Sequence, residues 1–186
     1  MFSAVKTPPP DIEIQAHLTA LHIEEWLRDD VFHFKWWVLL CLIVVALLIW
    51  WNRLDKSRLP ETCLYAALTT IIVLGIFEWG EELILWDFPT DVIPIFPPLS
   101  SVNLISLPLI YSLTYQYFKT WKRFILASLM ITAVICFIME PILAWAGFYE
   151  LIKWKYYYSF PIYAGMAIGI RALVNMIITV NSQNKK

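Results

Sequence analysis

Five long apolar stretches constrain the fold of this chain more than any other feature of its sequence. A helix that crosses the hydrocarbon core of a bilayer needs roughly 20 mostly apolar residues. The stretches run over residues 34–51, 61–85, 102–118, 124–147 and 159–180. Of the 186 residues, 60% are hydrophobic, whereas soluble domains are about 45–50% apolar. The sequence therefore predicts an all-α, polytopic membrane helical bundle with five transmembrane helices.

The first 33 residues differ from the rest of the chain because they are polar and acidic. After three consecutive prolines, residues 11–30 place apolar side chains roughly on one helical face. These side chains belong to Ile14, Leu18, Leu21 and Trp26. The pattern predicts an N-terminal amphipathic helix in the membrane interface, with a solvated tail helix as the alternative. We therefore divide the chain into a tail, 1–33, and a five-helix transmembrane domain, 34–186.

The Lys and Arg residues are divided unequally between the two sides of this predicted bundle. The loops 52–60 and 119–123, together with the C-terminal end, hold eight of the fourteen, the other side holds five, and Arg171 lies within the fifth stretch. The positive-inside rule puts the richer side in the cytoplasm. The sequence thus predicts a multi-pass protein of the cell (plasma) membrane, with its N-terminus outside and its C-terminus cytoplasmic.

Charged side chains fall inside or at the ends of the apolar stretches. Glu78, Glu81 and Glu82 end the second stretch, Glu140 lies in the fourth and Arg171 lies in the fifth. A charge in hydrocarbon costs at least about 2.5–3.5 kcal/mol, so such a residue faces a cavity, pairs with an opposite charge or carries a proton. Any function of the protein is expected to involve these residues.

The depth of these groups predicts a cluster of ion pairs. At a rise of about 1.5 Å per residue, Glu78 and Glu140 lie roughly 7 Å from the midplane toward the outer face, and Arg171 lies about 3 Å toward the inner face. A short loop joins the fourth and fifth helices, so we expect Arg171 to pair with Glu140 and to lie within reach of Glu78. The alternative is a structural salt bridge that fixes helix register.

The candidate intramembrane polar site combines these charges with nearby polar and aromatic side chains. Its core members are Glu78, Glu82, Glu140 and Arg171, and its further contributors are Glu81, Asn175, Trp79, Trp145 and Tyr149. The aromatic residues form either an interfacial belt or the lining of a pocket for an apolar ligand with a polar head. For Glu81 and Glu82, the alternative is simple hydration at the interface.

Two features predict local helix geometry in the last two stretches. Pro141 directly follows Glu140 and has no N–H to donate to the preceding turn, so a kink is expected there. Gly165 and Gly169 form a GxxxG pattern, which we interpret as tight helix packing within the bundle rather than as a dimer interface.

The sequence excludes several other kinds of site. The net charge is −1 and no basic stripe occurs, so no nucleic-acid partner is expected. His17 and His22 lie five residues apart in the tail, which is a poor spacing for a metal site on one helix. Phosphate-binding and nucleophile-elbow motifs are absent. We therefore expect no metal and no cofactor, and the expected partners are membrane lipids.

Four short blocks carry a resemblance to known proteins. They are Asp55-Lys56-Ser57-Arg58-Leu59, Leu85-Trp86-Asp87-Phe88-Pro89, Gln116-Tyr117-Phe118 with Trp121-Lys122, and Glu140-Pro141. In this order, over residues 34–180, the chain resembles an uncharacterised family of small polytopic integral membrane proteins found mainly in spore-forming, Bacillus-like bacteria. The resemblance implies a bacterial plasma membrane and no particular activity, and it assigns no functional residue.

The residues favour a non-enzymatic membrane protein that binds a lipid-like ligand or a partner helix at an outward-facing acidic and aromatic site. A second hypothesis is a membrane-embedded isoprenoid (terpene) cyclase in which Glu78 or Glu140 is the acid and tryptophans stabilise cations. A third is an ion or proton pathway along the same carboxylates. Whether the chain is an enzyme stays open from the sequence, and so do its ligand and its oligomeric state.

Overall fold

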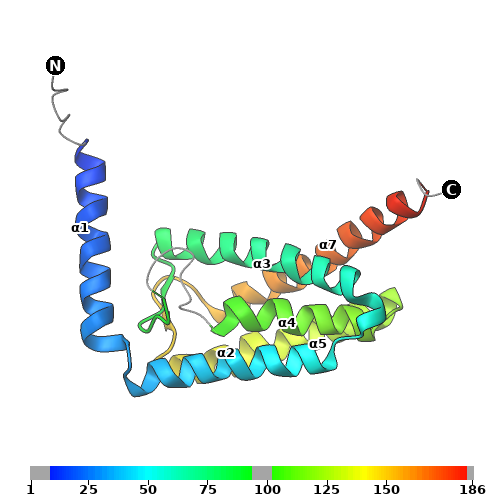
Figure 1. Ribbon diagram of the computed structural model, residues 1–186, viewed down its shortest axis with the longest axis horizontal. Helices are drawn as coiled ribbons and strands as arrows, with labels where there is room; N and C mark the ends of the chain where they lie inside the picture. Colours follow the sequence, from blue (N-terminus) through cyan, green and yellow to red (C-terminus); the bar gives the residue numbers. More distant parts are fainter. Residues whose placement is uncertain (1–8, 94–101, 184–186) are drawn as a thin grey trace.

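The computed structural model describes residues 9–93 and 102–183, and these residues are mostly helical (Figure 1). The elements in chain order are α1 (Pro10–Glu25), η1 (Trp26–Asp30), α2 (Phe34–Arg53), η2 (Lys56–Arg58), α3 (Leu59–Glu82), β1 (Trp86–Asp87), α4 (Val102–Tyr117), α5 (Trp121–Val134), η3 (Ile135–Met139), α6 (Glu140–Trp145), β2 (Glu150–Leu151) and α7 (Tyr156–Gln183). η1 and η3 are π-helical turns, and η2 is a 3-10 turn. The predicted all-α class is confirmed, with one two-residue ladder added to it.

Within the described ranges, four helical segments are long and apolar enough to cross a membrane. They are Phe34–Arg53, Lys56–Glu82, Trp121–Trp145 and Tyr156–Val180. The third predicted segment forms α4, which has 16 residues and therefore a length of about 24 Å. This is less than the roughly 30 Å of a hydrocarbon core. Helix length and hydropathy thus indicate a multi-pass helical membrane protein with four candidate spans, and the described part of the third predicted span is shorter than a full crossing.

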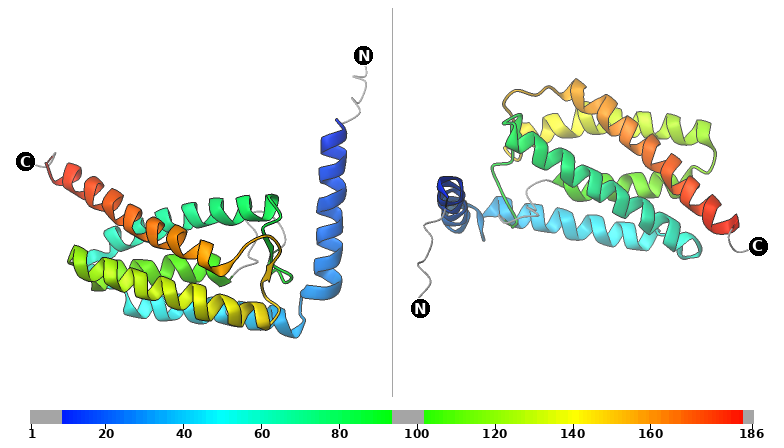
Figure 2. Two further views of the ribbon diagram at one scale, coloured as in Figure 1. Left: turned by 180° about the vertical axis from the view of Figure 1, so that it is seen from behind. Right: turned by 90° about the horizontal axis from the view of Figure 1, so that it is seen from above.

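α4 nevertheless occupies the centre of the bundle. It contacts α2, α3 and α5, and α7 completes the group by packing on α3 and α5 (Figure 2). Leu107 and Tyr111 of α4 are fully buried. The indole N–H of Trp50 in α2 donates to the hydroxyl of Ser112 in α4 at 2.9 Å. The short helix is thus surrounded by the longer ones.

α7 packs through a face that does not contain its glycines. Tyr163, Ala167 and Val174 are buried in the core, whereas Gly165 and Gly169 have no atom within 4 Å of where a β-carbon would stand. The predicted role of this GxxxG pair in tight packing within the bundle is therefore wrong. The rotation of α7 about its axis explains this. Tyr163, Ala167 and Val174, spaced by four and then seven positions, face the bundle, whereas the two glycines face away from it.

The fourth predicted span is continuous but irregular at its centre. The backbone N–H of Glu140 donates to the carbonyl of Ile135, five residues earlier, at the end of η3. Pro141 follows and cannot donate to a carbonyl one turn before it. A π-helical turn thus directly precedes Glu140 and Pro141 and sets the rotation at which Glu140 enters α6, whereas the kink expected at Pro141 stays a prediction.

α1 lies outside the bundle. Figure 1 shows it standing across the end of the bundle at which α2 begins, and none of its residues is buried. Its apolar side chains, such as Ile14 at 62% and Leu18 at 44%, are exposed. Trp26, the last residue of the predicted apolar face, donates its indole N–H to the carbonyl of Asp91.

An extended segment closes the end of the bundle near α1, and we call residues 86–93 the strap. The strap begins with an antiparallel ladder in which Trp86 faces Leu151 and Asp87 faces Glu150. Burial then alternates along it as in a strand with one buried face. The buried residues are Trp86, Phe88, Thr90 and Val92, and the exposed ones are Asp87, Pro89 and Ile93. The strap therefore turns one row of side chains toward the bundle.

Candidate functional site

The centre of the candidate site is Glu140, a carboxyl group with no exposed surface. Its solvent exposure is 0%, and neither carboxyl oxygen has a hydrogen-bond partner among the described residues. The hydroxyls of Ser159 and Tyr163 interact with its carboxyl group from α7, but the geometry of both contacts falls short of a normal hydrogen bond. Glu140 thus presents two acceptor atoms, in the protein interior, that no described donor satisfies.

Such an arrangement is costly for folding. Burying a polar group without a hydrogen-bond partner lowers the free energy of unfolding by about 1–3 kcal/mol, and burying an unpaired charge lowers it more. Most buried polar groups in proteins are paired, so each exception calls for an explanation. The π-helical turn before Glu140 also indicates a functional site, because single π turns inside α-helices occur frequently at such sites.

Aromatic rings cover Glu140 on the strap side. Tyr149 faces its carboxyl group and is only 4% exposed. Phe88 of the strap stacks on Tyr149 with ring centroids 5.1 Å apart, and Phe77 of α3 lies 5.5 Å from Phe88. We call these rings, together with Trp86 and Trp154, the aromatic cap. The buried acid and the aromatic cap form one continuous site.

Trp86 joins the aromatic cap to α3. Its ring lies against Gly80, and a β-carbon at Gly80 would come within 1.8 Å of that ring. The ring of Trp154 meets Trp86 edge-on with centroids 5.1 Å apart. The indole N–H of Trp86 is buried and has no partner among the described residues. The cap therefore adds one unsatisfied donor to the two unsatisfied acceptors of Glu140.

Arg171 lies elsewhere, and its predicted pairing with Glu140 is wrong. One guanidinium nitrogen donates to the carbonyl of Phe118 at 2.7 Å, and the other donates to the carbonyl of Lys119. About 20 residues of helix separate Lys119 from Glu140, which corresponds to about 30 Å. Depth along the helix did not predict this position, because the long side chain of Arg171 extends toward the end of the bundle at which α4 is followed by α5, away from Glu140.

Arg171 instead fastens the turn between α4 and α5. Its guanidinium lies 4.4 Å from the ring centroid of Phe124 and 4.9 Å from that of Trp121. Its two hydrogen bonds satisfy carbonyls that a helix C-terminus leaves without a donor. Arg58 adds a third such bond, to the carbonyl of Gln116 at 3.0 Å. This end of α4 is therefore held by two arginines, and Arg171 has a structural role.

The carboxylates at the end of α3 form a group separate from Glu140. Glu78 and Glu81 are partly buried and Glu82 is exposed. The acidic groups that face Glu81 are Glu78, Asp87 and Asp91, the last two of them in the strap. The three glutamates thus border the strap, whereas Glu140 lies beneath the aromatic cap.

The remaining predicted contributors also lie in different parts of the structure. Tyr149 belongs to the site. Asn175 lies near the other end, where its amide oxygen accepts a bond from the hydroxyl of Tyr115 at 3.4 Å. Trp79 and Trp145 are 77% and 89% exposed, which suits the belt of aromatic side chains at a membrane interface. From the predicted set, Glu140 and Tyr149 are the two that the fold brings together.

The two hydroxyls near Glu140 were not predicted from the sequence. Ser159 and Tyr163 are four residues apart, so they lie on the same side of α7. A polar pair at that spacing in an apolar stretch was a signal that could have been used. The role of Phe88 could not have been found in this way, because it depends on how the strap folds back over α6.

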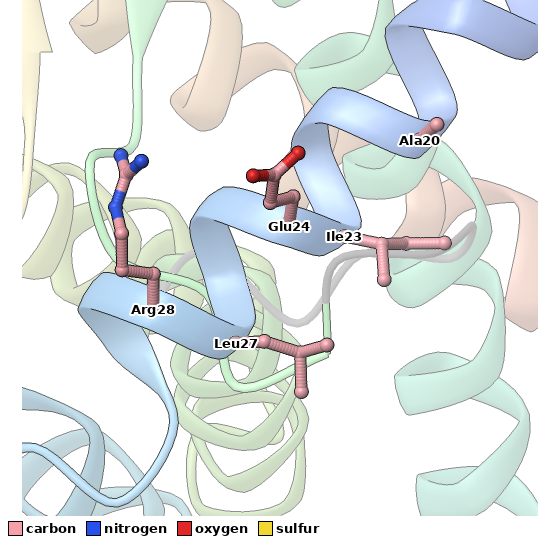
Figure 3. A pocket seen from close by; sticks show the side chains of 5 residues that line it. All are labelled: Ala20, Ile23, Glu24, Leu27 and Arg28. Carbon is pink, nitrogen blue, oxygen red and sulfur yellow. The ribbon is translucent and has the colours of Figure 1, made fainter.

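Two other features of the described residues bear on ligand binding. A depression beside α1 and η1 is lined by Ala20, Ile23, Glu24, Leu27 and Arg28 (Figure 3), and all five residues come from this one helical segment. In the described part of the chain, no three His, Cys, Asp or Glu side chains lie close enough together to hold a metal ion.

Comparison with known proteins yields no relative. No family model, no curated protein and no solved structure matches this chain. The resemblance noted from the sequence blocks therefore stays an expectation, and the function has to be argued from the site.

Proposed function

We propose that this protein is a five-crossing integral membrane protein that binds a lipid-like ligand, an apolar molecule with a hydrogen-bond-donating head, at Glu140 and the aromatic cap. The observation that carries the proposal is the buried carboxyl group of Glu140, whose two oxygens lack partners. A hydroxyl or amine on the ligand would supply the missing donor, and the rings would contact its apolar part.

The membrane topology is part of this proposal. α4 is short, but it lies among the longer helices, and the start of α2 and the end of α7 are at opposite ends of the bundle (Figure 1). An odd number of crossings accounts for that placement. With the Lys- and Arg-rich loops in the cytoplasm, the strap and the aromatic cap lie on the outer side. The ligand would then come from the outer leaflet.

Two alternative functions draw on the same residues. Acid-initiated isoprenoid chemistry is favoured by one observation, the position of the Glu140 acid beneath aromatic rings that can stabilise a carbocation. An ion pathway is less well supported, because Arg171 is engaged at the far end of α4. Large fully buried side chains, among them Tyr65, Tyr111 and Phe124, also fill the interior of the bundle.

Lipid mass spectrometry of the purified protein tests the proposal. We expect an isoprenoid or another polar-headed lipid to co-purify with the wild type and to be lost from Glu140→Leu, which removes both acceptors at similar volume. Glu150→Gln is the matched control, because Glu150 is an exposed carboxylate at the same end. Equal lipid content in all three proteins would contradict the proposal.

A further inference from the structure

The strap is fixed at both of its ends by different parts of the chain. At its start, the carbonyl of Leu85 accepts hydrogen bonds from the backbone N–H groups of Ile152 and Lys153, next to the β1–β2 ladder. Its middle carries Phe88, which stacks on Tyr149 over Glu140. Because Phe88 belongs to the aromatic cap, any movement of the strap would disturb the cap beside the proposed ligand site.

At its far end, the strap is held by the segment that joins α1 to α2. The indole N–H of Trp26 donates to the carbonyl of Asp91 at 3.0 Å, and that of Trp36 donates to the carbonyl of Val92 at 3.2 Å. The backbone N–H of Asp91 donates to the carboxylate of Asp30 at 3.2 Å. We call these three hydrogen bonds the latch. Phe32, between the two tryptophans, has a φ of 63°, a conformation that costs about 1–3 kcal/mol and needs support from its surroundings.

The latch brings acidic groups together. Asp30 of the joining segment faces Asp91 of the strap, and one carboxyl oxygen of Asp91 is buried without a partner among the described residues. The other charged or titratable groups that face these two are acidic Asp29, Asp87 and Glu81 and basic His33 and Lys35. Burial, reinforced by Asp30 and Asp87, raises the pKa of Asp91 to about 7. Burial also raises the pKa of Asp30 above its ordinary value.

We infer that the latch is closed by acid and released toward alkaline pH, and that it regulates access to the Glu140 site by holding the strap in place. The regulatory part rests on the proposed function, whereas the latch itself is a property of the fold that can be measured without any ligand. Two facing carboxyl groups repel each other when both are ionised, and a proton on Asp91 removes that repulsion.

The direction with pH follows from linkage. A carboxyl whose pKa is higher in the closed state binds its proton more tightly there. The closed state is therefore fully favoured below the ordinary Asp pKa of 3.8. The free-energy preference for the closed state declines as pH rises and is lost once pH passes about 7. Because each unit of pKa difference corresponds to a tenfold change in the equilibrium, we expect an increase in opening of at least about tenfold from pH 5 to pH 8.

Hydrogen exchange of the full chain in detergent, read by mass spectrometry and corrected for the intrinsic pH dependence of exchange, tests this inference. Peptides covering residues 26–36 and 86–93 should exchange at least about tenfold faster at pH 8 than at pH 5. In Asp91→Asn, which keeps the shape but cannot ionise, exchange should be slow at both pH values. Glu82→Gln, an exposed carboxylate next to the strap, should behave as the wild type does.

The outcomes separate the inference from its alternatives. Equal protection of the wild type at both pH values, or an unchanged pH dependence in Asp91→Asn, would overturn the latch. If Asp91→Asn fails to fold, Trp26→Phe serves instead, because losing its hydrogen bond should speed exchange of the strap at pH 5. Its failure to do so would also overturn the latch. If the latch responds to pH but no lipid co-purifies with the wild type, the latch stands and the proposed function fails.

Discussion

Glu140 and Arg171 show how differently two buried charged residues can be used. Arg171 has its two terminal nitrogens on backbone carbonyls and its plane among aromatic rings, so most of its burial is compensated, and only its Nε has no partner among the described residues. Glu140 has no such compensation. A buried residue that destabilises the fold without a compensating interaction is a candidate for function, because active and binding sites commonly lower stability.

The first prediction concerns the stability of Glu140 variants. Glu140→Leu should leave the unfolding temperature of the detergent-solubilised protein unchanged or raise it, with a gain of about 1 kcal/mol, because the unsatisfied carboxyl disappears. Glu140→Gln should not destabilise the protein, since no ion pair is broken. Thermal unfolding followed by circular dichroism measures both. A loss of several degrees in each variant would mean that the carboxyl group has a partner essential for folding.

The second prediction concerns Arg171. Arg171→Lys keeps the charge but cannot donate to two carbonyls from one planar group, so it should lower stability by about 1.5–3 kcal/mol. Arg123→Lys is the matched control, because Arg123 is exposed on α5, and it should change stability by less than about 0.5 kcal/mol. Chemical denaturation in detergent compares them. Equal midpoints for Arg171→Lys and the wild type would remove the structural role assigned to Arg171.

At the scale of elements, the strap depends on a single small residue in α3. The ring of Trp86 occupies the space that a side chain at position 80 would need, and this close approach lets the strap fold back over the helix end. η3 has a comparable role in the fourth span, because it sets the rotation of Glu140. Both features are local irregularities that position the aromatic cap over the acid.

The third prediction compares two glycines of the same helix. Gly75 has open space around it and Gly80 is covered by Trp86. Gly75→Ala should raise stability by up to about 1 kcal/mol, because alanine favours helix more than glycine does. Gly80→Ala should lower it by about 1–3 kcal/mol, because the ring of Trp86 has to shift. Hydrogen exchange of residues 86–93 should rise in Gly80→Ala alone. Similar behaviour of the two variants would show that Trp86 does not pack closely on α3.

At the scale of the whole molecule, the bundle has distinct ends. One end carries the strap, the aromatic cap and the joining segment to α1, and the other carries Arg58, Arg171 and the basic loops. This polarity gives the proposed topology a physical meaning, because the basic end suits the cytoplasmic leaflet and the ligand site then opens outward.

The fourth prediction tests that topology. A reporter fused after Lys186 should show cytoplasmic activity, and one fused before Met1 should show external activity, because an odd number of crossings separates the two ends. Alkaline phosphatase and green fluorescent protein fusions distinguish the two sides. Both reporters on the same side would indicate that α4 does not cross the membrane and that the number of crossings is four.

The sequence by itself determined the helical class and the position of the apolar segments. Hydrophobic length is a local property that each segment carries alone, so four of the five predicted spans correspond to helices long enough to cross. α4 covers nearly all of the predicted stretch 102–118, so its short length was already present in the sequence.

The tertiary structure alone decided which charges meet. Depth along a helix says how far a residue lies from the midplane, but not which way its helix is rotated or where a long side chain reaches. Glu78 and Glu140 have similar depths by sequence and Arg171 lies across the midplane from them, yet the structure puts the three residues in different surroundings. The same limit hid the contact of Phe88 with Tyr149 and that of Asp30 with Asp91. Those pairs join segments about 60 residues apart, and only the packed chain brings such segments together.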